Sequence, residues 1–362
     1  MLLVVAVVGP LAVAACAGTP VGSARTPVGE SASGPESVAG AGTVDPKGVS
    51  VVDAPAGPVT FAFGGDVHFE GEIRGALDAD PTQVMAAIAP SLSQADIAMV
   101  NLETAITDGG TPEPKTYNFR APATAFDALR AAGVDVVTMA NNHGMDYGPV
   151  GLADSLAARD AAGFPVLGVG NNRAEAFTPY TTTVNGQRIA ILGATDVLDA
   201  NLIAGWTATD SQPGLASAKD PGALIAAVQA ARATSDTVVV FLHWGTEGQT
   251  CPNSAQPALA QSLVDAGADI VVGSHAHRLI GAGHKGEALV AYGLGNFVFY
   301  TSGGAGAQTG VLHVTATGRH IDSYSWEPAV ISGGRPQPLT GADADAAVAA
   351  WDGLRACTDL TP

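Results

Sequence analysis

Side chains that commonly bind metal ions follow five short apolar runs of the chain. Five of the eight histidines occupy these positions. The donors are Asp66 and His68, Glu103, Asn142 and His143, His243, and His275 and His277. Imidazole, carboxylate and amide donors without a thiolate favour Mn, Fe or Zn. They exceed the needs of one tetrahedral zinc ion. The pattern therefore predicts two divalent ions joined by a carboxylate, an arrangement typical of hydrolysis or transfer at a phosphoryl or carbonyl centre.

Each of these motifs also has a simpler interpretation when taken alone. His275-Ala276-His277 is typical of a surface pair, Asn142-His143 of a turn, and His243 of a hydrogen-bonded core histidine. In extended backbone, alternate side chains face the same side, so Asp66 and His68 would point together, as would the outer residues of His275-Ala276-His277. Because five separate strand ends carry donors, we expect a metal centre.

Apolar runs alternate with Ala-rich stretches, which indicates an α/β fold. The runs predict strands at Val59–Gly65, Asp96–Leu102, Asp135–Ala140, Arg188–Gly193, Thr237–Leu242, Asp269–Gly273 and Ala288–Tyr292. The stretches predict helices at Pro81–Ser93, Ala123–Ala132, Pro149–Ala162, Gly222–Thr234, Ala255–Ala266 and Ala342–Ala356. Asn185-Gly186 predicts a hairpin within Thr181–Gly193, and Gly318 a turn within Gly310–Val330. Ligand sites in such folds form beyond the carboxyl ends of the strands.

The first sixteen residues carry no charge and end in Val13-Ala14-Ala15-Cys16. A run this short suits the core of a signal peptide better than a membrane span. Its end resembles the lipobox of bacterial lipoproteins, which implies cleavage before Cys16 and lipidation of its sulfur; an ordinary secretory signal is the alternative. Residues 17–58 are rich in Gly, Pro and Ser, which predicts a disordered, flexible tether. The folded domain is expected over residues 59–362.

The composition limits the function further. The formal net charge of -18 argues against non-specific binding to nucleic acid, and 47% hydrophobic residues provide for a sizeable core. Three cysteines are too few for a disulfide-rich scaffold. Once Cys16 is lipidated, an oxidising compartment favours a disulfide between Cys251 and Cys357. This disulfide would tie the loop after His243 to the C-terminal helix and hold Glu247 near the site.

Several longer motifs resemble those of the bacterial capsule-synthesis CapA family. They are Gly-Gly-Asp66-Val, Asn-Leu-Glu103-Thr, Phe119-Arg-Ala-Pro122, Ala140-Asn-Asn-His-Gly-Met-Asp-Tyr-Gly148, His243-Trp-Gly-Thr-Glu247, Gly-Ser-His-Ala-His277 and Tyr292-Gly-Leu-Gly-Asn-Phe-Val-Phe299. The resemblance runs from about Val59 to Tyr300. It implies a calcineurin-like metallophosphoesterase-type layered fold, with central sheets flanked by helices. It also implies a role in the synthesis or export of poly-γ-glutamate at the cell surface.

Carried over by position, the resemblance implies a role for each donor. One ion would be held by Asp66, His68 and His277, the other by Asn142, His243 and His275, with Glu103 as the bridge. His143 would be the general acid or a donor to developing charge, and Asp146 would orient it. The chain departs from the phosphoesterase pattern in having Asn-Leu-Glu103 in place of a Gly-Asp-X-X-Asp-like motif. It departs from many CapA members in having His68 two residues after the first Asp.

Five further residues are predicted to face the substrate: Arg120, Lys115, Glu247, Trp244 and Asn296. Arg120 would clamp a carboxylate or phosphate, or lie on the surface; Asn296 would orient a ligand histidine, or close a turn.

Three functions remain open at this stage. The chain is a lipid-anchored dinuclear metal hydrolase or transferase acting on an anionic envelope polymer, a non-catalytic accessory of a polymer synthase or exporter, or a secreted phosphoesterase.

Overall fold

The computed structural model describes residues 56–301 and 303–362. The expected signal segment with Cys16, and the expected linker up to residue 55, lie outside the described residues. Within the described ranges, no helix has both the length and the apolar character that a membrane span requires. The domain has a mixed α/β fold with two central sheets flanked by helices, which confirms the expected fold class.

The first sheet combines a parallel centre with an antiparallel extension. Its strands pair in the order β18-β17-β16-β1-β2-β5-β6, and β15 adds to the end of β1. The bounds are β1 (Val59–Val67), β2 (Ile97–Leu102), β5 (Val136–Thr138), β6 (Val166–Leu167), β15 (Asn296–Val298), β16 (Gln308–Thr317), β17 (His320–Ser332) and β18 (Arg335–Pro338). Strands β1, β2, β5 and β6 are parallel, whereas β16, β17 and β18 are antiparallel to their neighbours.

The second sheet is built in the same way. Its order is β13-β14-β12-β11-β9-β8, with parallel pairing from β9 to β14 and antiparallel strands at both edges. The bounds are β8 (Tyr180–Val184), β9 (Gln187–Thr195), β11 (Thr237–Trp244), β12 (Ile270–His275), β13 (Leu279–Lys285) and β14 (Ala288–Leu294). Two short pairs complete the strands: β3 (Ala105–Ile106) with β4 (Arg120–Ala121), and β7 (Val169–Gly170) with β10 (Gly214–Leu215).

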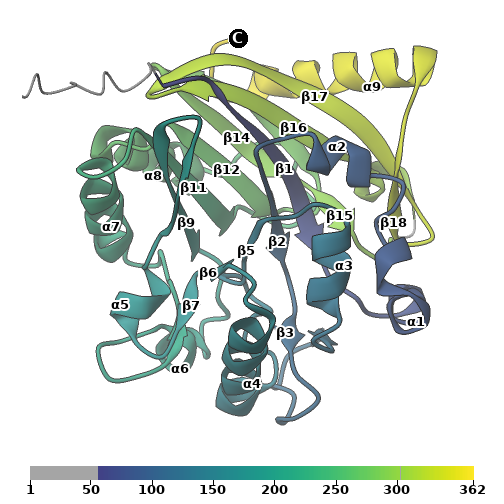
Figure 1. Ribbon diagram of the computed structural model, residues 1–362, viewed down its shortest axis with the longest axis vertical. Helices are drawn as coiled ribbons and strands as arrows, with labels where there is room; N and C mark the ends of the chain where they lie inside the picture. Colours follow the sequence, from purple (N-terminus) through teal and green to yellow (C-terminus); the bar gives the residue numbers. More distant parts are fainter. Residues whose placement is uncertain (1–55, 302) are drawn as a thin grey trace, which may run out of the picture. The chain divides into compact units, whose positions relative to one another are not determined.

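The helices surround the two sheets, and most of them lie against an outer face (Figure 1). They are α1 (Glu72–Ala79), α2 (Ala89–Ser93), α3 (Ala125–Ala131), α4 (Gly148–Ala162), α5 (Arg173–Ala176), α6 (Ile203–Trp206), α7 (Gly222–Arg232), α8 (Ala255–Ala266) and α9 (Gly341–Gly353). Alternation along each strand separates the cores. Phe61 and Phe63 of β1 meet Val239 and Phe241 of β11 between the sheets, whereas Ala62 joins the core beneath α1–α4. A third core lies between the second sheet and helices α7 and α8.

Most of the expected elements are present. Every predicted strand forms, and so do the helices predicted after residue 120, with shifted ends. The predicted helix Pro81–Ser93 is wrong: a 3-10 turn (η1, Pro81–Gln83) is followed separately by α2. Pro90 explains the break, because its ring and missing N–H exclude it from a helix interior but not from the first turn. Helix α1 was not predicted, since Gly75 weakens its helical pattern.

Parallel pairing brings the functional ends of the strands together. Asp66 of β1 is paired with Asn101 of β2, and His243 of β11 with Ser274 of β12. Gly65 permits a close approach here, because a Cβ at this position would lie 1.9 Å from the carbonyl oxygen of Gly295. That oxygen accepts the backbone N–H of Asp66 at 2.9 Å. The backbone of Asp66 is therefore held between two strands.

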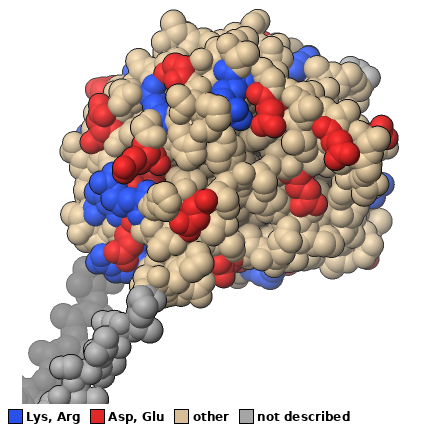
Figure 2. All heavy atoms as spheres, turned by 90° about the horizontal axis from the view of Figure 1, so that it is seen from above, with Lys and Arg blue, Asp and Glu red and all other residues tan. Residues whose placement is uncertain are grey.

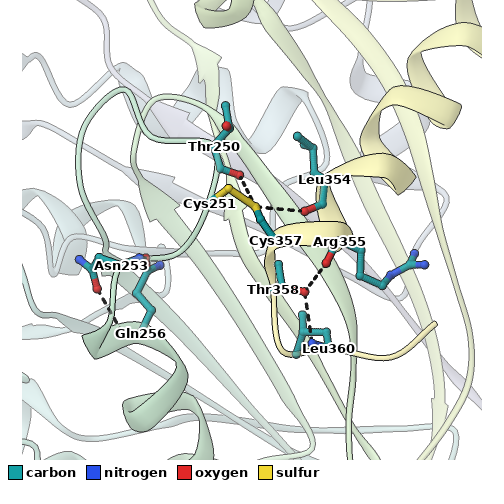
Figure 3. Close-up of a disulfide and its surroundings, with 9 residues drawn as sticks. All are labelled: Thr250, Cys251, Asn253, Gln256, Leu354, Arg355, Cys357, Thr358 and Leu360. Atoms are coloured by element: carbon teal, nitrogen blue, oxygen red, sulfur yellow. Dashed lines mark hydrogen bonds between the residues drawn. A yellow bond between two sulfur atoms is a disulfide. The ribbon is translucent and has the colours of Figure 1, made fainter.

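Cys251 and Cys357 form a disulfide with a Cα–Cα distance of 5.7 Å. It joins the loop after β11 to the 3-10 turn η3 (Leu354–Cys357) that follows α9 (Figure 3). Within that loop, the N–H of Gly248 donates to the carbonyl oxygen of Ala276 at 2.8 Å. The crosslink therefore connects the C-terminal turn with the loop that contacts the His275–His277 segment.

We expect loss of this disulfide to lower the free energy of unfolding by about 2–4 kcal/mol. The crosslink spans 106 residues, so it restricts the unfolded chain considerably. Thermal or denaturant unfolding of oxidised, reduced and Cys251→Ser/Cys357→Ser protein measures the change. The double variant should not respond to reductant; equal stability of oxidised and reduced wild-type protein would contradict the prediction.

Candidate metal centre

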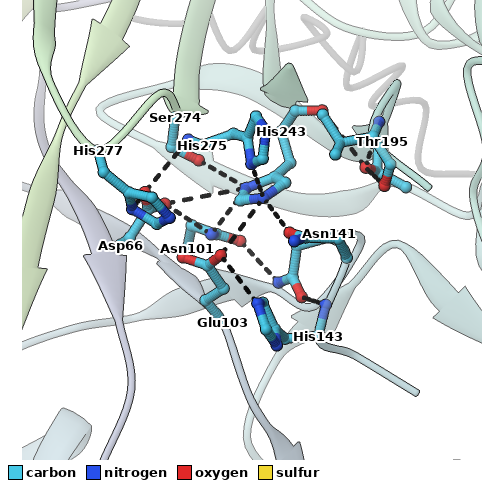
Figure 4. Close-up of polar contacts among 12 residues, drawn as sticks. Asp66, Asn101, Glu103, Asn141, His143, Thr195, His243, Ser274, His275 and His277 are labelled. Atoms are coloured by element: carbon cyan, nitrogen blue, oxygen red, sulfur yellow. Dashed lines mark hydrogen bonds and ion pairs between the residues drawn. The ribbon is translucent and has the colours of Figure 1, made fainter. Parts of the chain in front are cut away.

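The polar cluster lies where the carboxyl ends of the parallel strands of both sheets meet (Figure 4). The first sheet supplies Asp66, Asn101, Glu103, Asn141, Asn142 and His143, and the second supplies His243, Ser274, His275 and His277. Nearly all of these side chains are buried; the side chain of His277 is 19% exposed. The backbone N–H of His275 donates to Asp66 Oδ2 at 3.1 Å, so the two sheets are bonded at this point.

Glu103 is a fully buried carboxylate without a hydrogen bond. Neither of its side-chain oxygens has a hydrogen-bond partner among the described residues. The nearest imidazole nitrogens, of His243 and His143, lie 3.5 and 3.8 Å from Oε1. Burial, reinforced by the charge of Asp66, raises the pKa of Glu103 well above its usual value. Because an uncompensated buried carboxylate costs several kcal/mol, a cation fits beside Glu103.

Two groups of donors surround this carboxylate. Glu103, His275 and His277 bring one donor atom each within 4.8 Å of one another, and so do Asp66, Glu103 and His243. Glu103 belongs to both groups, which is the arrangement of a bridging ligand. The groups differ from the expected ligand sets, because His275 and His277 share one of them. This combination of carboxylates and imidazoles fits a divalent metal ion of the Mn, Fe or Zn type.

Asn142 lies against the second of these groups. Its Oδ1 is 2.7 Å from His243 Nε2, and His275 Nδ1 is 3.1 Å from the same nitrogen. The structure therefore brings together Asp66, Glu103, Asn142, His243, His275 and His277 out of the seven predicted ligands.

The sequence predicts an extended His275–His277 segment, but the backbone there is not extended. His275 and His277 have φ angles of 94° and 52°, in the left-handed region that few non-glycine residues adopt. The expected geometry is thus wrong, although the two rings still converge, with centroids 5.9 Å apart. Unusual backbone of this kind persists where surrounding contacts hold it. Here the bonds of His275 N–H to Asp66 and of Ala276 O to Gly248 do so.

His68, the seventh predicted ligand, belongs to neither group of donors. Its Nδ1 accepts the backbone N–H of Glu70 at 3.0 Å, and its Nε2 lies 3.4 Å from the backbone nitrogen of Tyr300. Its ring packs against Phe119, Phe299 and Tyr300, with centroids 4.1–4.6 Å away. In this structure both ring nitrogens of His68 face backbone N–H groups, and the imidazole is part of an aromatic cluster.

His143 reaches the cluster from a fixed position. Its Nδ1 is 2.6 Å from Asp146 Oδ2, while its Nε2 faces Glu103. Lys115 Nζ donates to Asp146 Oδ1 at 2.8 Å and to the carbonyl oxygen of Asn142. Burial raises the pKa of Asp146 to about 7 against the lowering effect of Lys115. Lys115, predicted to bind substrate, is therefore occupied in holding the His143–Asp146 pair.

Amides and a hydroxyl orient the imidazoles. Asn101 Nδ2 donates to Asp66 Oδ1 at 2.8 Å and lies 3.1 Å from His243 Nδ1, as does Ser274 Oγ. Asn296 Oδ1 is 2.8 Å from His277 Nδ1, so Asn296 orients that ring, one of its two expected roles. Such contacts select the ring nitrogen that faces a metal ion. Asn101 and Ser274 are not among the predicted site residues, although both lie in the motifs Asn-Leu-Glu103-Thr and Gly-Ser-His-Ala-His277.

Asn141 performs a related role among the amides. It donates to Asn101 Oδ1 and to Leu102 O, both at 2.9 Å, and accepts the backbone N–H of His143 at 3.0 Å. It therefore joins the ends of β2 and β5.

The pKa values of the histidines in the two donor groups are shifted in opposite directions. Burial lowers the pKa of His243 well below its usual value and that of His275 to about 3, so both are neutral near pH 7. Burial would also lower the pKa of His277, but Glu103 and Asp66 outweigh it and raise that pKa to about 9. Neutral imidazoles are the form that binds metal, and His277 would have to release a proton to join them.

The remaining predicted substrate residues lie in different environments. Trp244 is fully buried and its Nε1 donates to Tyr292 O at 2.9 Å, which places it in the core rather than in contact with a substrate. Glu247 is exposed on the loop after β11, and its charge contributes to the raised pKa of His277. The Arg120 guanidinium lies 4.9 Å over the ring of Tyr147.

The chain is similar to proteins of a known family. The pattern of the family described as "Bacterial capsule synthesis protein PGA_cap" matches residues 60–301. "Capsule biosynthesis protein CapA" of Bacillus anthracis is 36% identical over 235 residues, 63% of this chain and 55% of that protein. A "probable polyglutamine synthesis accessory protein" of Mycobacterium tuberculosis is 32% identical over 212 residues, 56% of this chain and 55% of that protein.

The likeness to solved structures is weaker. A phosphatase of Mycoplasma pneumoniae has a TM-score of 0.47 at 16% identity, over 76% of this chain and 94% of that one. The chain spans about half the length of the curated relatives it matches.

We expect Glu103→Gln to reduce metal uptake at least tenfold, because the exchange removes the one charge shared by both donor groups. Equilibrium dialysis with Mn²⁺ or Zn²⁺, followed by elemental analysis, measures uptake. Glu287→Gln, in the exposed turn between β13 and β14, is the matched control and should bind as the wild type does. Equal uptake by all three proteins would show that Glu103 is not a ligand.

Proposed function

The chain belongs to the bacterial capsule synthesis protein family, and from this premise we propose that it acts in the synthesis or export of an anionic polymer such as poly-γ-glutamate. We propose further that it does so as a hydrolase or transferase with two divalent metal ions. The observation that carries the catalytic part is the buried carboxylate of Glu103, which has no hydrogen-bond partner among the described residues and lies between two groups of donors. Burial and the charge of Asp66 disfavour the ionised form of Glu103, and a bound divalent ion would stabilise it.

Bound divalent ions would act as Lewis acids that polarise the bond under attack. Asp66, Glu103, Asn142, His243, His275 and His277 would hold them, and Asn101, Ser274 and Asn296 would keep the imidazoles oriented. No other described cluster of His and carboxylate side chains offers such a donor set.

His143 supports proton transfer at the same place. The raised pKa of Asp146 and the 2.6 Å contact favour a proton shared between Asp146 Oδ2 and His143 Nδ1. His143 Nε2 then carries the hydrogen that faces the centre. Its transfer to the leaving oxygen or nitrogen leaves an imidazole that keeps the shared proton at Nδ1. General acid catalysis of this kind contributes about 10²–10⁴-fold to a rate.

The charge distribution favours local capture of a polyanion. Figure 2 shows the end of the molecule that is uppermost in Figure 1, away from the carboxyl ends of the strands, and on this end basic side chains lie beside acidic ones. With a net charge of -18, long-range attraction would oppose such a substrate. Arg120 supports short-range capture, because no carboxylate among the described residues forms an ion pair with its guanidinium. A guanidinium binds carboxylates through two parallel hydrogen bonds.

We expect His143→Gln to lower turnover about 10²–10⁴-fold while metal uptake is retained, since the imidazole is not among the grouped donors. Turnover is measured with metal-loaded protein on bis-p-nitrophenyl phosphate and on γ-glutamyl-p-nitroanilide. His320→Gln, whose side chain is 78% exposed, is the control.

The outcomes separate the candidate functions. Metal binding without cleavage of either probe by the wild type would favour the accessory role that the name of the mycobacterial relative states for that protein. Undiminished turnover in His143→Gln would exclude His143 as the acid.

We also propose that Cys16 is lipidated and that the chain is anchored outside the cytoplasm. The support is the sequence Val13-Ala14-Ala15-Cys16 after an uncharged apolar run. In a bacterium that processes lipoproteins, Cys16→Ser should move the protein from the membrane to the soluble or secreted fraction, because the acyl chains supply the anchor. Ser23→Ala is the control. Identical fractionation of Cys16→Ser and wild type would contradict the proposal.

A further inference from the structure

One aromatic residue contacts both members of the His143–Asp146 pair. The ring of Phe119 stacks on the imidazole of His143 with centroids 4.0 Å apart and planes 18° apart. The backbone N–H of Phe119 donates to Asp146 Oδ2 at 2.6 Å, the oxygen that His143 Nδ1 also contacts. Phe119 therefore contacts the imidazole from its face and holds the carboxylate that anchors its edge.

The stack fixes a freedom that the Asp146 contact leaves open. A single hydrogen bond at Nδ1 restrains one edge of the imidazole, and small coupled changes of the two side-chain torsions can still tilt the ring plane while that contact is kept. Stacked rings resist such a tilt, because it would lose the face-to-face contact between the imidazole and the ring of Phe119. With both contacts in place, His143 Nε2 faces Glu103 Oε1 at 3.8 Å.

Phe119 is itself held in place on several sides. Its carbonyl accepts the N–H of Ala105 at 3.2 Å, where β4 pairs with β3 two residues after Glu103. Its ring also stacks on His68, with centroids 4.6 Å and planes 25° apart. His68 is anchored in turn by the 3.0 Å bond from Glu70 N to its Nδ1. The position of Phe119 is thus tied both to the Glu103 segment and to the end of β1.

We propose that Phe119 is a positioning residue that holds the imidazole plane of His143 so that Nε2 faces the metal centre. His68 acts through the same stack, as a support for Phe119. The inference rests on the proposed function of His143 as the proton donor. It also explains why a histidine at position 68 accompanies this site without lying in either donor group.

The test replaces the ring of Phe119 and preserves its backbone N–H. Phe119→Leu and Phe119→Met remove the stack, whereas Phe119→Tyr retains an aromatic ring. Phe126→Leu is the matched control. It is a buried phenylalanine of α3 stacked on Phe164 with centroids 5.3 Å apart, and it belongs to the core beneath the first sheet.

The first readout is nuclear magnetic resonance of the full chain labelled with ¹⁵N-histidine. The His143 Nδ1–H signal, identified by its loss in His143→Gln, should lie far downfield and exchange slowly because of the short contact with Asp146. We expect this signal to be lost or broadened in Phe119→Leu and Phe119→Met, and to be present in Phe119→Tyr and Phe126→Leu. Uptake of Mn²⁺ should be unchanged in all four variants.

The second readout is turnover of the two chromogenic probes. We expect kcat to fall about 10–100-fold in Phe119→Leu and Phe119→Met with KM within about twofold, and Phe119→Tyr to restore most of it. Unchanged kcat and an unchanged His143 signal in Phe119→Leu and Phe119→Met would overturn the proposal. So would losses in Phe126→Leu equal to those in Phe119→Leu, because they would reflect stability alone. If the wild type cleaves neither probe, the proposed function fails and the His143 signal alone decides the positioning role.

Discussion

The burial of two carboxylates at the meeting edges of two sheets is the constraint on which the site depends. Asp66 is compensated by protein, since it accepts bonds from Asn101 and from the backbone of His275 and lies 3.4 Å from His277. Glu103, equally buried, has no such bond among the described residues. Because the protein interior has a low dielectric constant, a buried carboxylate without such bonds is much less stable than one that accepts them. A cation bound by the surrounding imidazoles would compensate the charge of Glu103.

Rigid supports outside the ligands maintain this arrangement. His275 and His277 adopt left-handed backbone angles. The bond from Gly248 to Ala276 holds this turn, and the disulfide ties the loop carrying Gly248 to the C-terminal turn. On the first sheet, hydrogen bonds from Lys115 and Phe119 hold Asp146, and the ring of Phe119 stacks on His143. The candidate ligands therefore lie at strand ends, and loops held by hydrogen bonds and aromatic stacking fix the positions of their side chains.

The electrostatics connect this architecture to the proposed role in a family of capsule synthesis proteins. A strongly acidic chain repels a polyanion at long range, and salt limits that repulsion to about 8–10 Å. Under the proposed function, binding at close range would depend on the local charges of metal ions and of Arg120.

The α/β class, the strands and the donor residues that follow them could be predicted from the sequence alone, because strand periodicity and apolar runs are local properties. The family resemblance also implied that Asp146 orients His143, and the two side chains are in contact. The helix predicted over Pro81–Ser93 is wrong, because Pro90 cannot lie in a helix interior. Three features depend on the fold: the ring nitrogens of His68 face backbone N–H groups, Lys115 holds Asp146, and Trp244 lies in the core. These outcomes depend on backbone angles and on neighbours distant in sequence, which compete for each polar atom, and no local pattern encodes that competition.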